Sequence, residues 1–345
     1  MPKPPKHIAV LRLSAMGDVA MIVPVLRAFL QQHQNIKITI ISRKFFKPFF
    51  VGIPNVTFFE FDDRIRHKGF LGLLRLFRDL QKLKIDAFAD LHNVLRSKIV
   101  TTLFALSGKK TATLDKGRKD KKALTRTENK IFKQLPTMFH RHCQVFKKLG
   151  FNIDLSNPIF PEKAILDLDT LNLIEFNPNQ KLIGIAPFAQ YQSKIYPIDL
   201  MQQVIDNLSS DSNNKILLFG GGKSEIEQLD KLSKNKEYIK NCAGKLSLEQ
   251  ELKLISKLDV MLSMDSANSH ISSMLGINTI TLWGATHPFA GFAPFNQLQE
   301  NCLLSDRNLY PKLPTSVFGN KIVEGYQDVM RTISVEDIIL KIYSK

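Results

Sequence analysis

Residues 7–30 read HIAVLRLSAMGDVAMIVPVLRAFL, and this stretch decides the fold. The apolar run at 8–11 has the length and composition of a buried parallel strand. Small residues at 14–18 predict a tight turn, and apolar residues recur beyond it at helical spacing, with Pro24 marking the regular start of a helix. In a strand–turn–helix unit, backbone amides of the turn can face a ligand at the carboxyl end of the strand.

The predicted turn carries one acidic residue, Asp18. A carboxylate at the mouth of a strand–helix turn can accept a proton from a substrate. Nothing obvious in the local sequence neutralises this carboxylate. Asp18 is therefore the candidate proton acceptor of the first half of the chain.

The composition predicts a soluble, globular chain with two domains. At 345 residues the chain exceeds what one hydrophobic core usually supports, and its hydrophobic content of 44% is ordinary. Runs of about 18 apolar residues, which would predict a transmembrane helix, do not occur. The N-terminus leaves no room for a signal peptide before the first strand. Three scattered cysteines without metal-binding spacing fit a reducing cytoplasm and argue against a zinc site.

The formal net charge of +16 is unevenly distributed along the chain. Between residues 96 and 148 there are fifteen Lys or Arg residues and three acidic residues, a local net charge of +12. Such a segment can be a solvated, partly mobile basic surface. The concentration of positive charge in this segment also fits an anionic partner, such as a phosphorylated lipid, a membrane surface or nucleic acid. Charge alone does not distinguish among these partners.

Segments of strand length alternate with segments of helical spacing, which predicts an α/β fold with parallel sheets and helices on both faces. In the first half the pattern predicts strands at 37–42, 56–61 and 86–91 and helices at 70–83 and 140–149. The polar, Lys-rich segment 109–130 is predicted to be a loop. Three prolines in 152–178, around a short predicted helix at 166–176, indicate a linker. A second series of strands and helices starts with the strand 181–186 and closes with an amphipathic helix at 335–343.

Two segments of the second series place polar residues or glycines directly after a predicted strand. Lys194 lies just before a Tyr-Pro pair and is either an ordinary surface lysine or a phosphate ligand. Gly221 and Gly222, in the segment GGGKSE at 220–225, allow a ligand to approach the backbone at a helix N-terminus. A tight strand-to-helix turn explains these glycines equally well, because neither GxGxxG nor Walker spacing is present.

A third segment, MDSANSH at 264–270, crowds Asp265, Ser266, Asn268 and His270 into one predicted strand–helix junction. Asp265 or Ser266 could simply cap the helix, which is worth about 1 kcal/mol, but a cap needs only one such group. His270 can also be a packed core histidine. Because a helix N-terminus favours an anion, the junction predicts a site for a diphosphate.

Four segments, in this order along the chain, carry a resemblance to a known family. They are RLSAMGD at 12–18 with Pro24 after it, DLHNVLRS at 90–97, KIYP at 194–197, and DSANSH at 265–270 together with GATHP at 284–288. The chain resembles the bacterial lipopolysaccharide heptosyltransferases, glycosyltransferase family 9. It departs from the family at Ala267, where Gly is usual, and at Ala285, where Pro is usual; both residues are small, so the fold and reaction class should be kept.

The resemblance implies an α/β fold of the GT-B type, with two Rossmann-like, doubly wound parallel-sheet domains facing a central cleft. We expect an N-terminal acceptor-binding domain at 1–165, a C-terminal nucleotide-sugar-binding domain at 166–333 and a C-terminal helix at 334–345. The implied reaction is an inverting, metal-independent transfer of a heptose or related sugar, without a cofactor. Its expected donor is a nucleotide sugar, ADP-heptose or, as the alternative, another nucleotide sugar, and its acceptor is the lipopolysaccharide core or lipid A.

The resemblance also implies a role for each candidate residue. Asp18 is the catalytic base. The donor-binding residues are Lys194, Gly221, Gly222, Asp265, Ser266, Ala267, Asn268 and His270. The acceptor-binding residues are Ser14, Gly17, Asn93, Arg96 and Lys98. Together with the basic segment 109–130, the cations would meet acceptor phosphates, so we expect a cytoplasmic protein held peripherally at the inner face of the cytoplasmic membrane.

Two other classes of protein remain as alternatives. The first is a non-catalytic protein that binds nucleic acid or an anionic surface, which the charge of +16 would favour. The basic segment lacks interleaved aromatic residues and any helix-turn-helix or RNP pattern, which argues against nucleic acid. The second is a dinucleotide oxidoreductase, but the turn at 14–18 lacks GxGxxG.

Overall fold

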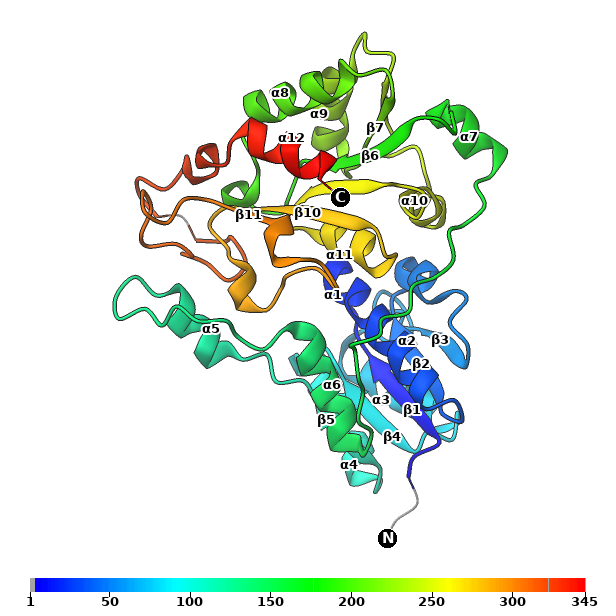
Figure 1. The fold of residues 1–345 in the computed structure, drawn as a ribbon. Helices are drawn as coiled ribbons and strands as arrows, with labels where there is room; N and C mark the ends of the chain where they lie inside the picture. The colour runs from blue at the N-terminus through cyan, green and yellow to red at the C-terminus, as the bar shows by residue number, and fades with distance from the viewer. Residues whose placement is uncertain (1–3, 176, 322, 345) are drawn as a thin grey trace. The chain divides into compact units, whose positions relative to one another are not determined.

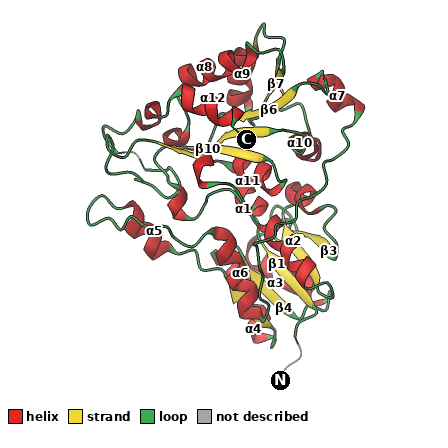
Figure 2. Cartoon of the chain, viewed as in Figure 1, coloured by secondary structure: helices red, strands yellow, loops and turns green. Residues whose placement is uncertain are grey.

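The computed structural model describes residues 4–175, 177–321 and 323–344. The chain forms two compact units, each built on one parallel sheet (Figures 1 and 2). The N-terminal unit comprises Met1–Gly117 and Pro136–Phe160, and the C-terminal unit comprises Arg118–Leu135 and Pro161–Lys345. The described helices include none long and apolar enough to cross a membrane.

The N-terminal unit has a five-stranded sheet in the order β3-β2-β1-β4-β5. Its strands are β1 (His7–Leu11), β2 (Lys37–Ser42), β3 (Val56–Glu60), β4 (Ala87–Asp90) and β5 (Lys110–Thr113). Its helices are α1 (Met16–Ala20), α2 (Ile22–Gln32), α3 (Gly69–Gln81), α4 (Leu95–Leu106) and α6 (Met138–Leu149). Strand β1 pairs with β2 on one side and with β4 on the other, so the strand order reverses direction between β1 and β4.

Alternate residues of the central strands reach opposite faces of this sheet. Ala9 and Phe88 face a core cluster formed with α3 and α4, to which Leu80 and Phe104 contribute. On α2 and α6, Phe29 and Phe146 pack with their ring centroids 4.8 Å apart. The predicted strand–helix alternation of this half is therefore confirmed.

The structure corrects the predicted turn after β1. Helix α1 begins at Met16, so Gly17 and Asp18 lie in a helical first turn and not in the turn itself. Pro24 is the third residue of α2, which begins at Ile22. Proline is tolerated there because the first amides of a helix have no partner four residues earlier.

The C-terminal unit has a six-stranded parallel sheet in the order β11-β10-β9-β6-β7-β8. Its strands are β6 (Lys181–Ala186), β7 (Asn214–Leu218), β8 (Ile239–Asn241), β9 (Val260–Met264), β10 (Asn278–Trp283) and β11 (Cys302–Leu304). Its helices are α5 (Arg118–Thr125), α7 (Leu168–Ile174), α8 (Ile198–Ser209), α9 (Lys223–Ser233), α10 (Leu248–Ile255), α11 (Ala267–Met274) and α12 (Val335–Tyr343). Here the strand order reverses between β6 and β9.

Five short 3-10 helices complete the described structure: η1 (Lys44–Phe50), η2 (Gln192–Lys194), η3 (Pro288–Ala290), η4 (Gln299–Asn301) and η5 (Val329–Thr332). Helix α7 is the short helix predicted in the linker, and Phe176, at the end of that prediction, lies outside the described residues. Helix α12 has the predicted bounds. Its Ile338 and Ile342 are buried in the core of the C-terminal unit, so this helix belongs to that unit.

The prediction of a loop at 109–130 was wrong. Residues 110–113 form β5, which pairs with β4, and 118–125 form α5. Leu124 and Leu135 pack with Ala290, and the Leu135 amide donates to the carbonyl of Phe289 at 2.9 Å. These contacts place residues 118–135 in the C-terminal unit. The expected division had a single boundary after residue 165, whereas the chain crosses between the two units more than once.

Candidate functional site

Each unit carries one group of polar side chains, and each group lies where the strand order of its sheet reverses. In open parallel sheets, ligands bind in the crevice at the carboxyl ends of the strands at this reversal. In the N-terminal unit the group follows β1 and β4 and includes Asp18 and His92. In the C-terminal unit it follows β6 and β9 and includes Lys194 and Asp265.

The Asp18 carboxylate forms an ion pair with the guanidinium of Arg12. Arg12 is buried, and it donates from Nε to the Ser14 carbonyl at 2.7 Å and from Nη1 to the Leu91 carbonyl at 2.6 Å. The side chain of Asp18 is 27% exposed. The expectation that nothing nearby neutralises Asp18 was therefore wrong, because Arg12 turns back from the end of the strand to meet it. The arginine fixes the position of a carboxylate that still reaches solvent.

Asp90 organises the loop after β4. This fully buried carboxylate accepts from the amides of His92 at 2.9 Å and Asn93 at 2.8 Å, and from the Ser97 hydroxyl at 2.8 Å. Asn93 adopts a left-handed backbone conformation, with φ of 47°, and its side-chain amide donates to the Leu114 carbonyl at 2.6 Å. The carboxylate thus holds a tight turn that presents His92 at the carboxyl end of the strand.

His92 is a site residue that the sequence prediction missed. Burial, with the positive charges of Arg12 and Lys116, lowers the pKa of His92 to about 4. The imidazole is therefore neutral at pH 7, and its nitrogens can donate or accept one hydrogen bond each. The negative charge of Asp18 acts on this pKa in the opposite direction and raises it, so the two side chains interact electrostatically within the N-terminal unit.

The predicted acceptor-binding residues have different surroundings. Ser14 is half-buried before α1, and Gly17 is buried within α1. Arg96 and Lys98 are exposed near the start of α4, and the Arg96 guanidinium lies 3.4 Å from the Asp63 carboxylate. The structure thus brings Ser14, Gly17 and Asp18 together in one segment, while Asn93 is engaged in anchoring the backbone.

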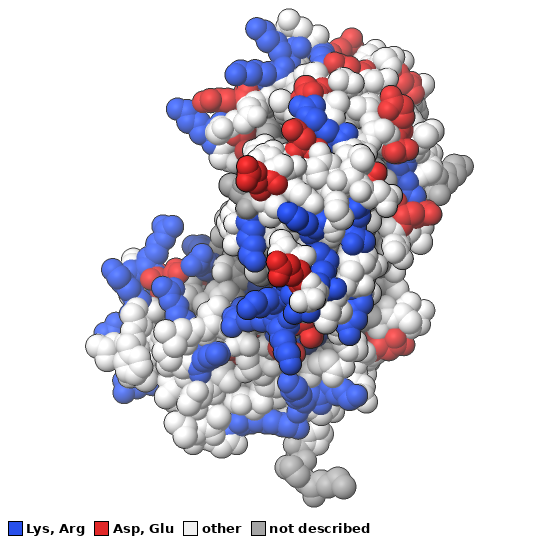
Figure 3. All heavy atoms as spheres, turned by 90° about the vertical axis from the view of Figure 1, so that its left-hand side faces the viewer, with Lys and Arg blue, Asp and Glu red and all other residues white. Residues whose placement is uncertain are grey.

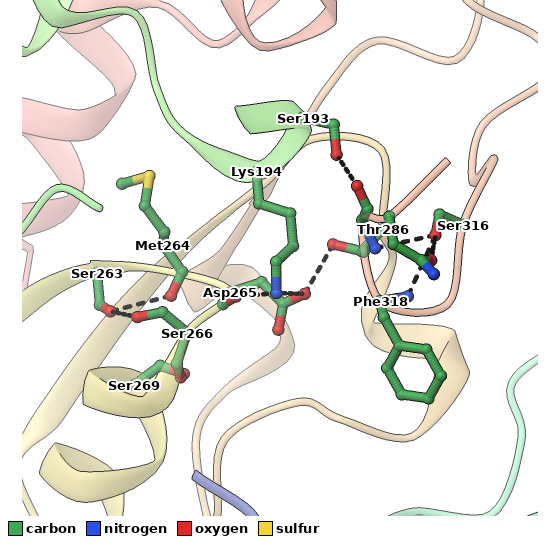
Figure 4. Close-up of polar contacts among 12 residues, drawn as sticks. Ser193, Lys194, Ser263, Met264, Asp265, Ser266, Ser269, Thr286, Ser316 and Phe318 are labelled. Carbon is green, nitrogen blue, oxygen red and sulfur yellow. Dashed lines mark hydrogen bonds and ion pairs between the residues drawn. The ribbon is translucent and has the colours of Figure 1, made fainter. Parts of the chain in front are cut away.

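Lys194 and Asp265 form the centre of the group in the C-terminal unit (Figure 4). The Lys194 ammonium donates to the Asp265 carbonyl at 2.6 Å and lies 3.3 Å from its carboxylate. The Thr286 hydroxyl donates to the same carboxylate oxygen at 2.8 Å. The side chains of the ion pair are only 12% and 11% exposed. An ammonium has three N–H donors, and Asp265 takes two of them, so among the described residues Lys194 retains one donor for a ligand.

Two loops hold this pair in place (Figure 4). The Ser193 carbonyl accepts from the amide of Ala285 at 3.0 Å, and the Ser193 hydroxyl donates to the Gly319 carbonyl at 2.6 Å. The Ser316 hydroxyl accepts from the amide of Gly319 at 2.9 Å. The segment around Ser316 lies far along the chain from the predicted motifs, and only the structure identifies it as part of the site.

Gly284 allows the close approach of these loops, which gives a first prediction. A Cβ at Gly284 would lie 2.4 Å from the Ser193 carbonyl oxygen, whereas a Cβ at Gly221 would meet nothing within 4 Å. We expect Gly284→Ala to lower the free energy of unfolding by about 1–3 kcal/mol through overpacking, and Gly221→Ala to leave it nearly unchanged. Urea unfolding of both variants measures this, and equal stability of the two would contradict the tight approach.

The remaining predicted donor-binding residues surround the start of α11. Ser266 precedes the helix and lies 3.2 Å, hydroxyl to hydroxyl, from Ser263; Ala267 begins the helix. Asn268 is half-buried, and His270 is buried. Ser266 makes no capping hydrogen bond from its side chain, so the capping alternative does not explain it. The first amides of α11 remain as donors for an anion.

Gly221 and Gly222 follow β7, at the same edge of the sheet. The Gly221 amide donates to the Glu225 carboxylate at 2.8 Å, and Gly222 has a φ of 87°, which favours glycine. The turn therefore requires glycine at 222 for its backbone conformation. Both glycines are exposed and can also border a ligand.

His287, in the loop after β10, gives a second prediction. Burial, together with the charges of Arg307 and Lys130, lowers its pKa to about 4. Its Nδ1 accepts from the Phe289 amide at 3.1 Å. Below the ordinary histidine pKa of about 6.5, the unfolded chain binds a proton that the folded chain does not, so stability falls with pH by about 1.4 kcal/mol per unit down to about pH 4.

We therefore expect His287→Asn, whose amide oxygen can replace Nδ1, to reduce the loss of stability between pH 7 and pH 5 by about 2 kcal/mol. Urea unfolding at the two pH values measures the difference. The exposed His140 provides the matched control, His140→Asn, which should keep the pH dependence of the wild type. An unchanged pH dependence in His287→Asn would contradict the lowered pKa.

Comparisons with known proteins identify the family of the chain. The model of glycosyltransferase family 9 (heptosyltransferase) matches residues 73–321, and the chain belongs to this family. Among its relatives is the lipopolysaccharide core heptosyltransferase OpsX of Haemophilus influenzae, 25% identical over 97% of this chain and 95% of the relative. The chain is therefore a glycosyltransferase, and the resemblance seen in the sequence is confirmed.

Solved structures confirm the fold class. The glycosyl transferase family 9 protein from Veillonella parvula DSM 2008 matches with a TM-score of 0.76 and 19% identity, over 99% of this chain and 97% of that one. E. coli heptosyltransferase WaaC with ADP-2-deoxy-2-fluoro heptose matches with a TM-score of 0.66 and 18% identity, over 97% and 98% of the two chains. The chain has the GT-B fold of these heptosyltransferases.

Proposed function

We propose that this glycosyltransferase moves a heptose from ADP-heptose to the lipopolysaccharide core or lipid A, with inversion at the anomeric carbon and without a metal ion. The observation that carries the proposal is the pair of polar groups at the two strand-order reversals, one with a carboxylate and one with a cation. The donor analogue named with the E. coli WaaC structure supports ADP-heptose as the donor.

In this proposal the C-terminal unit binds the donor. Lys194 donates its third N–H to a diphosphate oxygen, and the first amides of α11 supply further donors to the same charge. Asp265 and Thr286 hold the lysine, and Ser266, Asn268 and His270 border the sugar and diphosphate. When the bond between the anomeric carbon and the diphosphate oxygen breaks, these groups stabilise the negative charge on the leaving ADP.

The N-terminal unit binds the acceptor and supplies the base. Asp18 accepts the proton of the acceptor hydroxyl as its oxygen attacks the anomeric carbon from the face opposite ADP, which inverts the configuration. Arg12 holds the carboxylate in position. Arg96 and Lys98 contact acceptor phosphates. The protein associates peripherally with the membrane that carries the acceptor. Figure 3 shows Lys and Arg side chains gathered on one face of the molecule.

The experiment for this proposal compares nucleotide sugars at fixed concentration, with a deacylated lipopolysaccharide core as the acceptor and EDTA present. We expect transfer from ADP-heptose, a product whose anomeric configuration by NMR is opposite to that of the donor, and full activity in EDTA. Preference for another nucleotide sugar would contradict the donor assignment. Retained configuration, or activity lost in EDTA and restored by a divalent cation, would contradict the mechanism.

A further inference from the structure

The N-terminal unit carries a surface on which large apolar side chains alternate with cations. We name it the apolar–basic surface and define it by Phe45, Ile65, Phe70, Leu71 and Leu95 together with Arg43, Lys44, Arg64, Lys68 and Arg96. All ten side chains are exposed, and the exposed fraction of Ile65 reaches 82%. Single exposed apolar residues are common on protein surfaces and need no explanation. Five such side chains in three short segments form a cluster, which indicates an interaction site.

Three segments that follow β2, β3 and β4 bring these residues together. Asp63, after β3, bonds the Arg43 guanidinium at 2.7 Å and lies 3.4 Å from the Arg96 guanidinium. One carboxylate therefore joins the segment after β2 to the start of α4. Because β2, β3 and β4 are parallel strands of the same sheet, their carboxyl ends share an edge.

The segment between β3 and α3 is held by hydrogen bonds; it carries Ile65 and leads into α3, whose first turn carries Phe70 and Leu71. The Asp62 carboxylate accepts from the amides of Arg64 and Ile65, each at 3.0 Å. His67 is buried below this turn and accepts from the Asp62 amide at 3.0 Å. The apolar side chains are therefore exposed by an ordered, hydrogen-bonded backbone.

The charge of the surface identifies its partner. Five cations and two carboxylates, Asp62 and the partly buried Asp63, leave an excess of positive charge around the apolar residues. Apolar side chains that enter the acyl boundary, with Lys and Arg at the headgroup level, are the features by which proteins bind anionic bilayers. A protein partner would need a shape-matched acidic surface, whereas a bilayer needs only this alternation.

We propose that the apolar–basic surface docks the N-terminal unit on an anionic lipid bilayer. This proposal deepens the proposed function, on which it rests for its biological sense, because Asp18 follows β1 at the same edge of the sheet. Docking by this surface brings the proton acceptor to the membrane that holds a lipid-linked acceptor. Each cation near an anionic bilayer strengthens binding about fivefold, so binding depends on salt and on lipid charge.

The test is sedimentation of the full chain with vesicles of phosphatidylcholine containing 30% phosphatidylglycerol. We expect binding that weakens at least tenfold in pure phosphatidylcholine and severalfold in 0.5 M NaCl. The variant Ile65→Ser/Phe70→Ser/Leu71→Ser should lower the partition coefficient at least tenfold. The control Ile165→Ser/Leu168→Ser, in the C-terminal unit and at side chains 90% and 76% exposed, should change it less than twofold.

Equal binding of the triple variant and the control, or no binding of the wild type to the anionic vesicles, would overturn the proposal. Concentration-dependent dimers without vesicles that the triple variant abolishes would also overturn it, since the surface would then join two copies. Transfer to a deacylated acceptor separates this proposal from the proposed function. Activity on the deacylated acceptor should be unchanged in the triple variant. If the wild type showed no activity on this acceptor, the proposed transferase function would be contradicted. The proposal that the apolar–basic surface binds a bilayer would then still be tested by the vesicle experiment.

Discussion

Asp18→Asn should lower the rate of sugar transfer by a factor of about 10²–10⁴, because general base catalysis contributes that much. The substitution keeps the size of the side chain and removes both its capacity to accept the proton and its charge pairing with Arg12. Binding of ADP should be unchanged, since the predicted donor-binding residues all lie in the C-terminal unit. Steady-state rates and isothermal titration with ADP measure the two effects.

The matched control for this variant is Asp79→Asn. Asp79 is another partly exposed carboxylate of the N-terminal unit that pairs with an arginine, Arg66. It should retain wild-type transfer, because its role is to hold the turn before α3. A rate in Asp18→Asn within tenfold of the wild type would contradict the assignment of the base, and equal losses in both variants would indicate a general effect on folding.

Lys194→Met should weaken ADP binding and lower kcat/KM by about 10²–10³, because it removes a cation expected to stabilise the leaving diphosphate. The variant should also lower the free energy of unfolding by about 3–5 kcal/mol, since it leaves the nearly buried Asp265 without its charged partner. Titration with ADP, steady-state kinetics and urea unfolding measure these quantities separately.

Arg331→Met provides the control for Lys194→Met. Arg331 pairs with Asp199 on the surface of the same unit, with both side chains about half exposed. Such an exposed pair contributes little to stability, so this variant should keep both transfer and ADP binding. Unchanged ADP affinity in Lys194→Met would contradict the role of Lys194, whatever its stability.

Much of the fold could be predicted from periodicity alone. The strands β2 and β6 and the helix α12 have the predicted bounds, because each is a clean run of apolar or amphipathic residues with clear boundaries. The strands β8 and β11, of three residues each, were not predicted, since a strand this short gives no period. Helix α6 ends at Leu149 as predicted, and Gly150 follows it in a left-handed conformation.

The region 109–135 was hard to predict for a different physical reason. The mostly polar helix α5 buries Leu124 but is otherwise rich in lysine, so its apolar stripe is too narrow to see. The residues it packs with, such as Ala290, are more than 150 positions further along the chain. Contacts between residues far apart in the chain decide which unit a segment belongs to, and these contacts cannot be predicted from the local sequence.

The candidate site was predictable in its motifs and not in its contacts. The sequence identified Asp18, Lys194 and Asp265 as chemically important, and their roles remain proposals. It did not identify Arg12 as the partner of Asp18 or Thr286 as the partner of Asp265, although both lie inside the quoted motifs. Arginine at the end of a strand and threonine in a loop are common, so only the folded chain distinguishes these residues.

The most direct measurement is mass spectrometry of a lipid A–core acceptor incubated with the wild-type protein and ADP-heptose. We expect the acceptor to gain one heptose, with one ADP released for each sugar transferred. Tight ADP binding without any gain in acceptor mass would contradict the assigned donor or acceptor. Failure to bind ADP at all would contradict the central claim, that the group around Lys194 and Asp265 holds a nucleotide-sugar donor.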